Sequence, residues 1–260
     1  MKESHVLVEV SDNIATITLN RPQAMNALNR EIVDELTNIL ASLQVDKDVR
    51  CIVLTGNGKA FCAGGDLGYL SELSDPVVIR KFIADVGQLA IAIINMDKPV
   101  IAMVNGVAAG AGFNLALACD IIICAQSARF AQSFSKVGLI PDCGGLFLLP
   151  RLIGLPKAKE LMFTADLIDA VSAFSLGLVN HVVEDDKLKE EVYQLAYKLA
   201  LSAPIALGFT KRMINRSFDL DVETILEREA ELQTICMGTK DYKEGVAAFR
   251  EKRQPIFRGC

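Results

Sequence analysis

The stretch PVIAMVNGVAAGAGFN, residues 99–114, decides the fold class of this chain. It begins with Val100–Val104, an apolar run without the alternation of a strand that has one solvated face. Such runs indicate strands that are buried on both faces by helices. Small residues follow, and a helix is expected near Gly112–Cys119. This order of strand, glycine-rich turn and helix predicts an α/β fold.

The same order recurs on both sides of this stretch. Upstream, a glycine-rich loop that ends at Leu67 separates a strand from a helix expected at about residues 77–94. Apolar segments of strand length occur at residues 51–55, 121–125 and 128–132, and as an alternating pair around a polar turn at 5–10 and 14–19. The alternating pair predicts a hairpin. A helix is expected directly after it, because Asn29 is a good N-cap before residues with helical spacing.

Beyond about residue 187 the pattern becomes entirely helical. Amphipathic segments are found at residues 188–201, 205–214, 222–237 and 240–250. They include no strand that could join the sheet, so their apolar faces must pack on the core or on another subunit. We therefore predict a core at residues 1–200 and a helical oligomerisation region at residues 201–260.

The composition excludes several classes of protein. A chain of 260 residues, 51% of them hydrophobic, can bury a core without disulfides or metal, and a net charge of −5 argues against a nucleic-acid partner. The seven cysteines are scattered and mostly lie in apolar runs, which indicates reduced thiols. No apolar stretch has the length of a signal peptide or a membrane span, so we expect a cytoplasmic protein without a membrane partner.

The sequence contains few histidines that could serve in catalysis or metal binding. The two histidines, His5 and His181, both lie in strand-like segments, so histidine-based catalysis and metal sites are not expected. Gly56 and Gly58 follow a strand, but Phe61 stands where a dinucleotide fingerprint needs its third glycine. We predict no metal and no cofactor. Any chemistry must come from carboxylates, amides, hydroxyls or backbone N–H groups.

Two glycine-rich turns are the candidate binding elements: KAFCAGGDL at residues 59–67 and NGVAAGAGFN at residues 105–114. Small residues let a ligand approach the backbone closely, and the start of a helix leaves N–H groups unpaired. Together the turns could direct two N–H donors at one ligand oxygen. Taken alone, each turn is better explained by tight packing.

Six collinear segments resemble the crotonase (enoyl-CoA hydratase/isomerase) superfamily, and they span nearly the whole chain: residues 19–22 with 26–28, 60–67, 105–112, 119–121, 138–145 and 245–253. The resemblance implies a spiral of ββα units with a C-terminal helical region that builds homotrimers or dimers of trimers. It also implies an acyl-CoA substrate. The thioester oxygen would lie between the N–H groups of Gly65 and Ala111.

The resemblance further implies which residues contact the substrate: Ala24, Met25, Ala63, Gly65, Asp66, Leu67, Gly110, Asn114, Phe134, Phe249 and Lys252. Among these we expect Asp66 mainly to fix its own loop. Phe249 and Lys252 are expected to reach the coenzyme A of a neighbouring subunit, from a segment crowded with basic residues. Near Met25, a lysine or arginine that is common in relatives is absent.

Departures from the family pattern distinguish between its reactions. Hydratases carry two glutamates that hold and deprotonate water, and the matching positions here are Asn114 and Phe134. Neither an amide nor a phenyl ring can act as a general base. The segment FSKVGLIPD, residues 134–142, instead resembles the phenylacetate-pathway type that isomerises ring-epoxidised phenylacetyl-CoA and also Δ3,Δ2-enoyl-CoA. In that type the aspartate, here Asp142, is the catalytic base.

We therefore predict an acyl-CoA isomerase that acts through a thioester enolate, with Asp142 as the proton shuttle. Desolvation is expected to raise the pKa of this carboxylate, through the apolar neighbours Phe134, Leu139, Ile140 and Pro141. Alternatives remain open. Asp142 could merely cap a helix that starts near Cys143. The chain could also be a hydratase with another acid, a relative of the 4-chlorobenzoyl-CoA dehalogenase type, or a catalytically idle acyl-CoA binder.

Overall fold

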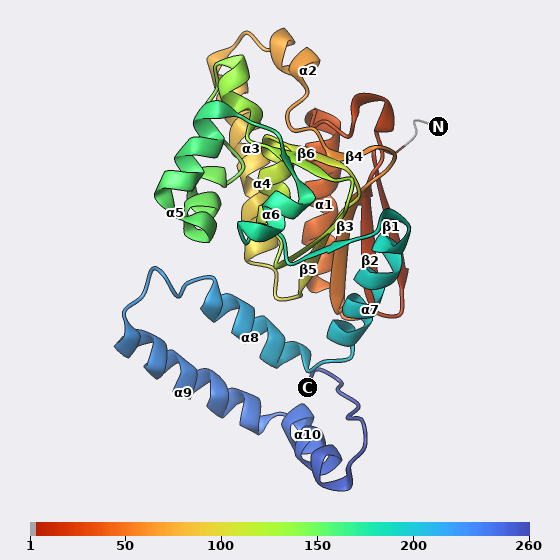
Figure 1. Ribbon diagram of the computed structural model, residues 1–260. Helices are drawn as coiled ribbons and strands as arrows, with labels where there is room; N and C mark the ends of the chain where they lie inside the picture. Colours follow the sequence, from red (N-terminus) through yellow and green to blue (C-terminus); the bar gives the residue numbers. More distant parts are fainter. Residues whose placement is uncertain (1–3) are drawn as a thin grey trace.

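Three successive strand–strand–helix units build the body of the protein (Figure 1). The computed structural model describes residues 4–260, so the first three residues of the predicted core lie outside the described part. The units are β3 (Cys51–Gly56), β4 (Ala60–Cys62) and α3 (Pro76–Ile94); β5 (Val100–Val104), β6 (Val107–Ala109) and α4 (Ala111–Leu117); and β7 (Ile121–Ala125), β8 (Arg129–Ala131) and α5 (Gly145–Thr164). The predicted spiral of ββα units is confirmed.

Each unit contributes its first strand to a large sheet and its second strand to a small one. The large sheet has the order β1-β2-β3-β5-β7-β10 and the small sheet the order β4-β6-β8-β9. The remaining strands are β1 (Val6–Ser11), β2 (Ile14–Leu19), β9 (Ile168–Asp169) and β10 (His181–Val183). The expected hairpin is the antiparallel pair β1–β2, and the centre of the large sheet is parallel. Strands β4 and β6 lie inside segments that the sequence presented only as turns.

Both faces of the large sheet are buried, which explains the apolar run of β5. Val100, Ala102 and Val104 belong to a core shared with α1 (Arg30–Val45), α3 and α4. Ile101 and Met103 face the opposite way, into a second cluster with α7 (Leu188–Ala200). Since successive side chains of a strand point to opposite faces, every residue of β5 must be apolar. Asn29 caps α1 as expected, because its side chain accepts a hydrogen bond from the Ile32 N–H at 3.1 Å.

The last three helices form a lobe apart from the sheets, drawn in blue in Figure 1. They are α8 (Pro204–Ile214), α9 (Val222–Gly238) and α10 (Lys240–Glu251), close to the segments expected from helical spacing. Lys211 anchors α8 to the body, since its Nζ contacts the Asp120 carboxylate at 2.7 Å and the carbonyls of Ile93 and Lys98 at 2.9 and 3.1 Å. The short helices α2 (Leu67–Glu72) and α6 (Ala170–Ser175) complete the fold.

All seven cysteines lie in the described part of the chain and are free, and five of them are buried. Among residues 4–260, no helix has the length and apolar character that a bilayer crossing requires.

Candidate active site

The first candidate donor is the N–H of Gly65, in the turn between β4 and α2. A parallel bridge fastens this turn to Leu28: the Leu28 N–H donates to the Gly64 carbonyl at 2.7 Å, and the Asp66 N–H donates to the Leu28 carbonyl at 3.0 Å. Because alternate backbone groups point to opposite sides, the N–H of Gly65 faces away from Leu28. Within residues 4–260 it donates no hydrogen bond, so it is available to a ligand.

The second candidate donor is the N–H of Ala111, the first residue of α4. Helix geometry leaves it without an intrahelical acceptor, and none is found elsewhere in the described residues. The two turns touch, because a Cβ on Gly64 would lie 2.8 Å from the Ala109 carbonyl oxygen and 3.4 Å from the Ala111 nitrogen. Gly64 and Gly110 have φ values of +97° and +50°, which glycine adopts without the strain of a side chain. The structure thus brings both donors together.

Asp142 lies on the loop between the 3-10 helix Ser133–Val137 and α5. Its Oδ1 is enclosed and has no hydrogen-bond partner among the described residues. Burial raises the pKa of this carboxyl group to about 6, which confirms the predicted direction. Leu139 and Ile140 do not provide the expected shielding, because these residues are 50% and 76% exposed.

The alternative that Asp142 caps α5 is also wrong. The N-cap of α5 is Gly144, and no side chain caps this helix. Asp142 instead takes part through its backbone carbonyl, which accepts from the Gly145 N–H at 3.0 Å and from Asn114 Nδ2 at 2.8 Å. Its carboxylate is therefore not needed for the helix start and is left for other chemistry.

Asn114 and Phe134, which replace the hydratase glutamates, lie beside these groups. Asn114 is fully buried, and both atoms of its amide are engaged, with Oδ1 accepting from Gln132 Nε2 at 2.7 Å. The Phe134 ring lies against Gly110, since a Cβ on that glycine would be 3.6 Å from its Cζ. Asn114 thus sits behind the site as a structural amide, whereas Phe134 forms part of its apolar wall.

Ala24 and Met25 are brought next to the first donor turn. Met25 ends the 3-10 helix Pro22–Ala24, and its carbonyl accepts from the Ala63 N–H at 3.0 Å. Met25 is 51% exposed and Leu67, the first residue of α2, is 56% exposed, so both stand at the surface of this edge. This arrangement is compatible with a ligand that passes over the loop.

Asp66 fixes its loop, as expected. Its carboxylate accepts from the Tyr69 N–H at 3.1 Å, which caps α2, and pairs with Arg21 at 2.5 Å. The sequence assigned no role to Arg21 and Asn26, yet both connect segments of the site through side-chain contacts. Asn26 is completely buried and donates to the Ala60 carbonyl at 2.8 Å. Its apolar surroundings in the sequence gave no sign of this contact, which spans 34 residues.

Phe249 and Lys252 are not brought to the donors within one chain. Phe249 lies in the last turn of α10 and Lys252 directly follows this helix, in the lobe that Figure 1 shows at the far end of the molecule from α2. Phe249 is 86% exposed. Of the basic residues near the C-terminus, Arg253 is already paired with Glu244 at 2.6 Å and with Glu251 at 2.7 Å, so it is not a free phosphate contact.

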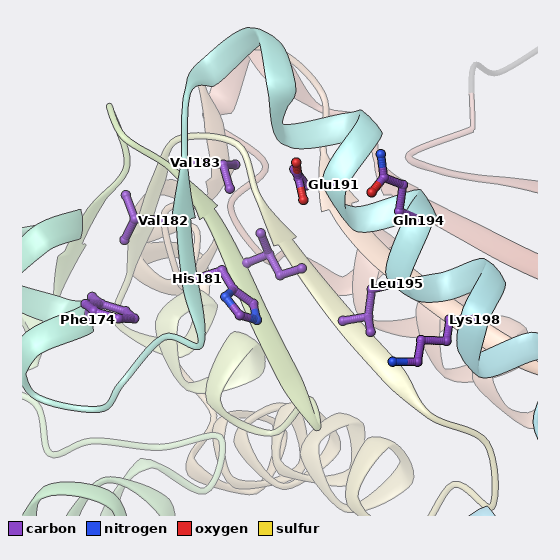
Figure 2. A pocket seen from close by; sticks show the side chains of 9 residues that line it. Phe174, His181, Val182, Val183, Glu191, Gln194, Leu195 and Lys198 are labelled. Atoms are coloured by element: carbon purple, nitrogen blue, oxygen red, sulfur yellow. The ribbon is translucent and has the colours of Figure 1, made fainter.

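The histidines lie away from these groups. Figure 2 shows His181 on the edge strand β10, in a hollow that it shares with Glu191, Gln194 and Lys198. No residue that lines this hollow belongs to either donor turn or to the Asp142 loop. His5, near the start of the chain, has its Nδ1 4.0 Å from Glu35 Oε1. In residues 4–260, no group of three or more potential metal ligands comes together.

The sequence pattern of the enoyl-CoA hydratase/isomerase family matches residues 9–259. The chain belongs to this family. It is 41% identical over 263 residues to 1,2-epoxyphenylacetyl-CoA isomerase of Escherichia coli (strain K12), with 98% of each chain covered. It is 38% identical over 259 residues to crotonyl-CoA hydratase of Syntrophomonas wolfei, with 99% of each covered.

Solved structures of the family share the fold over the whole length. The crystal structure of an enoyl-CoA hydratase from Bacillus anthracis gives a TM-score of 0.95 at 36% identity, and the match covers 98% of this chain and 100% of that one. The fold is therefore the crotonase fold, as the sequence motifs predicted, and the protein is an enzyme of the enoyl-CoA hydratase/isomerase family.

Proposed function

We propose that this family member is an acyl-CoA isomerase that converts 3-enoyl-CoA to 2-enoyl-CoA with Asp142 as its only base. The observation that carries the proposal is the buried, unpartnered Oδ1 of Asp142, on a loop that Asn114 ties to α4, the helix whose first N–H is one of the two unpaired donors. A carboxylate whose pKa burial raises to about 6 is a stronger base than an ordinary aspartate.

The two donors would hold the thioester oxygen of the substrate. When a proton leaves C2, negative charge moves onto this oxygen, and the N–H groups of Gly65 and Ala111 stabilise it. Removing one such donor typically costs about 3–4 kcal/mol of transition-state stabilisation. No cofactor is needed, because the donors and one base suffice.

Asp142 would shuttle a single proton. Its carboxylate takes the proton from C2, the electron pair of that C–H bond forms the dienolate, and the acid returns the proton to C4. The double bond then lies between C2 and C3, and the base is regenerated. No water is consumed, so the hydratase acids are not required.

The relatives also support two other reactions. One relative isomerises 1,2-epoxyphenylacetyl-CoA and another is a crotonyl-CoA hydratase. Hydration needs a group that positions and activates water, but the Asn114 amide is fully engaged and Phe134 has no polar atom. A ring-epoxide substrate would use the same donors and the same base, so it remains a second substrate of the proposed isomerase.

The test is a turnover comparison on one preparation. We expect 3-hexenoyl-CoA to be isomerised far faster than crotonyl-CoA is hydrated, with both followed by chromatography of the thioesters. The ring epoxide of phenylacetyl-CoA is tested as a third substrate. Hydration that outpaces isomerisation would assign the protein to the hydratases, and binding without any turnover would leave an idle acyl-CoA binder.

The pH dependence follows from the raised pKa of Asp142. The base must be ionised to accept the C2 proton, so kcat/KM should rise about tenfold per pH unit below pH 6 and level off above it. An unperturbed aspartate would place this limb near pH 4. Initial rates of isomerisation between pH 4.5 and 8 measure it, and a limb near pH 4 would contradict a buried base.

We further propose that the core at residues 1–200 carries the catalytic site and that the helical region at residues 201–260 builds trimers or dimers of trimers. The lobe exposes large apolar side chains, among them Ile214, Phe218, Val222, Leu226 and Ile235. Such a concentration on a small lobe favours burial against other subunits. Phe249 and Lys252 would then reach the site of a neighbour. Light scattering at micromolar concentration should give a trimer or hexamer, and a stable monomer would contradict this.

The five buried free cysteines also support our proposal of a reducing, cytoplasmic location.

A further inference from the structure

Two buried side-chain amides, those of Gln132 and Asn114, connect the small sheet to the loop that carries Asp142 through hydrogen bonds. Gln132, directly after β8, is 1% exposed and Asn114, on α4, is 0% exposed. Gln132 Nε2 donates to Asn114 Oδ1 at 2.7 Å, and Asn114 Nδ2 donates to the Asp142 carbonyl oxygen at 2.8 Å. The connection ends on the backbone of Asp142 and leaves its carboxylate untouched.

The loop at Asp142 needs such support. Cys143 and Gly144, the next two residues, have φ values of +48° and +79°. A residue other than glycine in this region is strained and keeps the conformation only when its surroundings hold it. Leu139 and Ile140, on the other side of Asp142, are mostly exposed and provide little packing. Cys143 is held by burial in the core, whereas the backbone of Asp142 itself is held by its carbonyl, through Asn114 and the Gly145 N–H.

Gln132 satisfies the acceptor end of the Asn114 amide. A carboxamide has a donor end and an acceptor end. The Asp142 carbonyl oxygen can only accept, so Asn114 Nδ2 faces it, and Gln132 Nε2 supports this orientation by donating to Oδ1 at the opposite end. With the amide reversed, two oxygens would face each other and the loop would lose its tether.

The Gln132 oxygen, at the far end of this pair of hydrogen-bonded amides, shows why a glutamine stands here. Gln132 Oε1 is buried and has no partner among the described residues. An unsatisfied buried oxygen lowers stability, and an apolar side chain of similar length would avoid that loss. Fold stability alone therefore does not favour glutamine here, whereas the need for an N–H donor does.

We propose that Gln132 and Asn114 are positioning residues for the reaction, and that they hold the backbone of Asp142 so that its desolvated carboxylate meets C2 and C4 of the substrate. The inference rests on the proposed function of Asp142 as the base. It places the determinant of the base's geometry at two residues that do not touch the reacting atoms.

The principal variant is Gln132→Met, which removes the donor and the orphaned oxygen but keeps the length of the side chain. We expect kcat for isomerisation to fall about 10- to 100-fold, since small misplacements of a catalytic group have effects of this size. The acid limb of kcat should move down from about pH 6 as water reaches the loosened carboxylate. The dissociation constant of a saturated acyl-CoA should stay unchanged.

The matched control is Thr55→Val. Thr55 is also buried and donates to a backbone carbonyl, that of Met103, at 2.8 Å, but it lies inside the large sheet. This variant should lower the melting temperature while kcat and the pH limb remain those of the wild type. If Gln132 has only a structural role, Gln132→Met should behave like Thr55→Val: a lower melting temperature with unchanged kcat and pH limb.

A double-mutant comparison separates the possible outcomes. If Gln132 acts through Asp142, adding Gln132→Met to Asp142→Asn should slow the residual rate no further. If the rate losses of the two single variants multiply in the double variant, this inference is overturned. It is also overturned if Gln132→Met keeps the wild-type kcat and pH limb while Asp142→Asn is inactive. Neither outcome would affect the proposed function. An Asp142→Asn enzyme that isomerises normally would overturn both the inference and the proposed function.

Discussion

Asp142→Asn is expected to slow 3-enoyl-CoA isomerisation by about 10²–10⁴-fold, the usual effect of losing a general base. The amide has nearly the same shape as the carboxylate but cannot accept the C2 proton. The residue's structural contacts run through its carbonyl oxygen, which accepts from Asn114 and Gly145, so the loop should persist. Steady-state rates with 3-hexenoyl-CoA measure the loss.

The control for this variant is its affinity for acyl-CoA. The donors at Gly65 and Ala111 are unchanged, so calorimetry with a saturated thioester should give the wild-type dissociation constant. Isomerisation at an undiminished rate, or rapid crotonyl-CoA hydration that survives the substitution, would show that another residue and another reaction are involved.

Gly112→Ala should impair both the donors and the fold. A Cβ at this position would lie 2.2 Å from the Cys62 carbonyl oxygen and 2.7 Å from its carbonyl carbon. Both are backbone atoms of β4, so α4 must move away and carry the N–H of Ala111 with it. Overpacking of this kind costs about 1–3 kcal/mol of folding free energy. Displacement of one donor should lower kcat by about 10²–10³-fold.

Gly87→Ala is the matched control for this substitution. Gly87 lies within α3, and a Cβ there would have no atom within 4 Å. Alanine should raise the free energy of unfolding by about 0.5–1 kcal/mol through helix propensity, with the rate unchanged. Denaturant unfolding and isomerisation rates of the two variants test the pair. Equal behaviour of Gly112→Ala and Gly87→Ala would contradict the close approach of α4 to β4.

The sequence predicted most of the long elements because their signals are local. It did not delimit the 20-residue α5, which contains Pro150 and Pro156 and is kinked at Gly154. Helical spacing located α3 and the four helices from α7 to α10, and alternation located the β1–β2 hairpin. It missed β4 and β6, which have three residues each, and the six-residue α2. Segments this short complete fewer than two periods of the strand or helix pattern, so their conformation is decided by the strands and turns that pack beside them.

The candidate site shows the same division. The glycines of both donor turns and the acid at position 142 could be named from the sequence, since residue type and a family motif mark them. The rise in the pKa of Asp142 was also predicted, but two of the four neighbours named as its cause, Leu139 and Ile140, are largely exposed. Which groups desolvate a side chain depends on where the loop lies, and the motif does not contain that information.

By itself, then, the sequence determined the α/β class, the repeated order of strand, turn and helix, the two turns able to supply donors and the absence of the hydratase acids. Only the tertiary structure decided that Asp142 Oδ1 is buried without a partner while the carbonyl oxygen of this residue is tied to Asn114, and that Gln132 donates to Asn114. The physical reason is separation along the chain. Contacts over 18 and 28 residues form only when packed helices and sheets bring the partners within hydrogen-bonding distance.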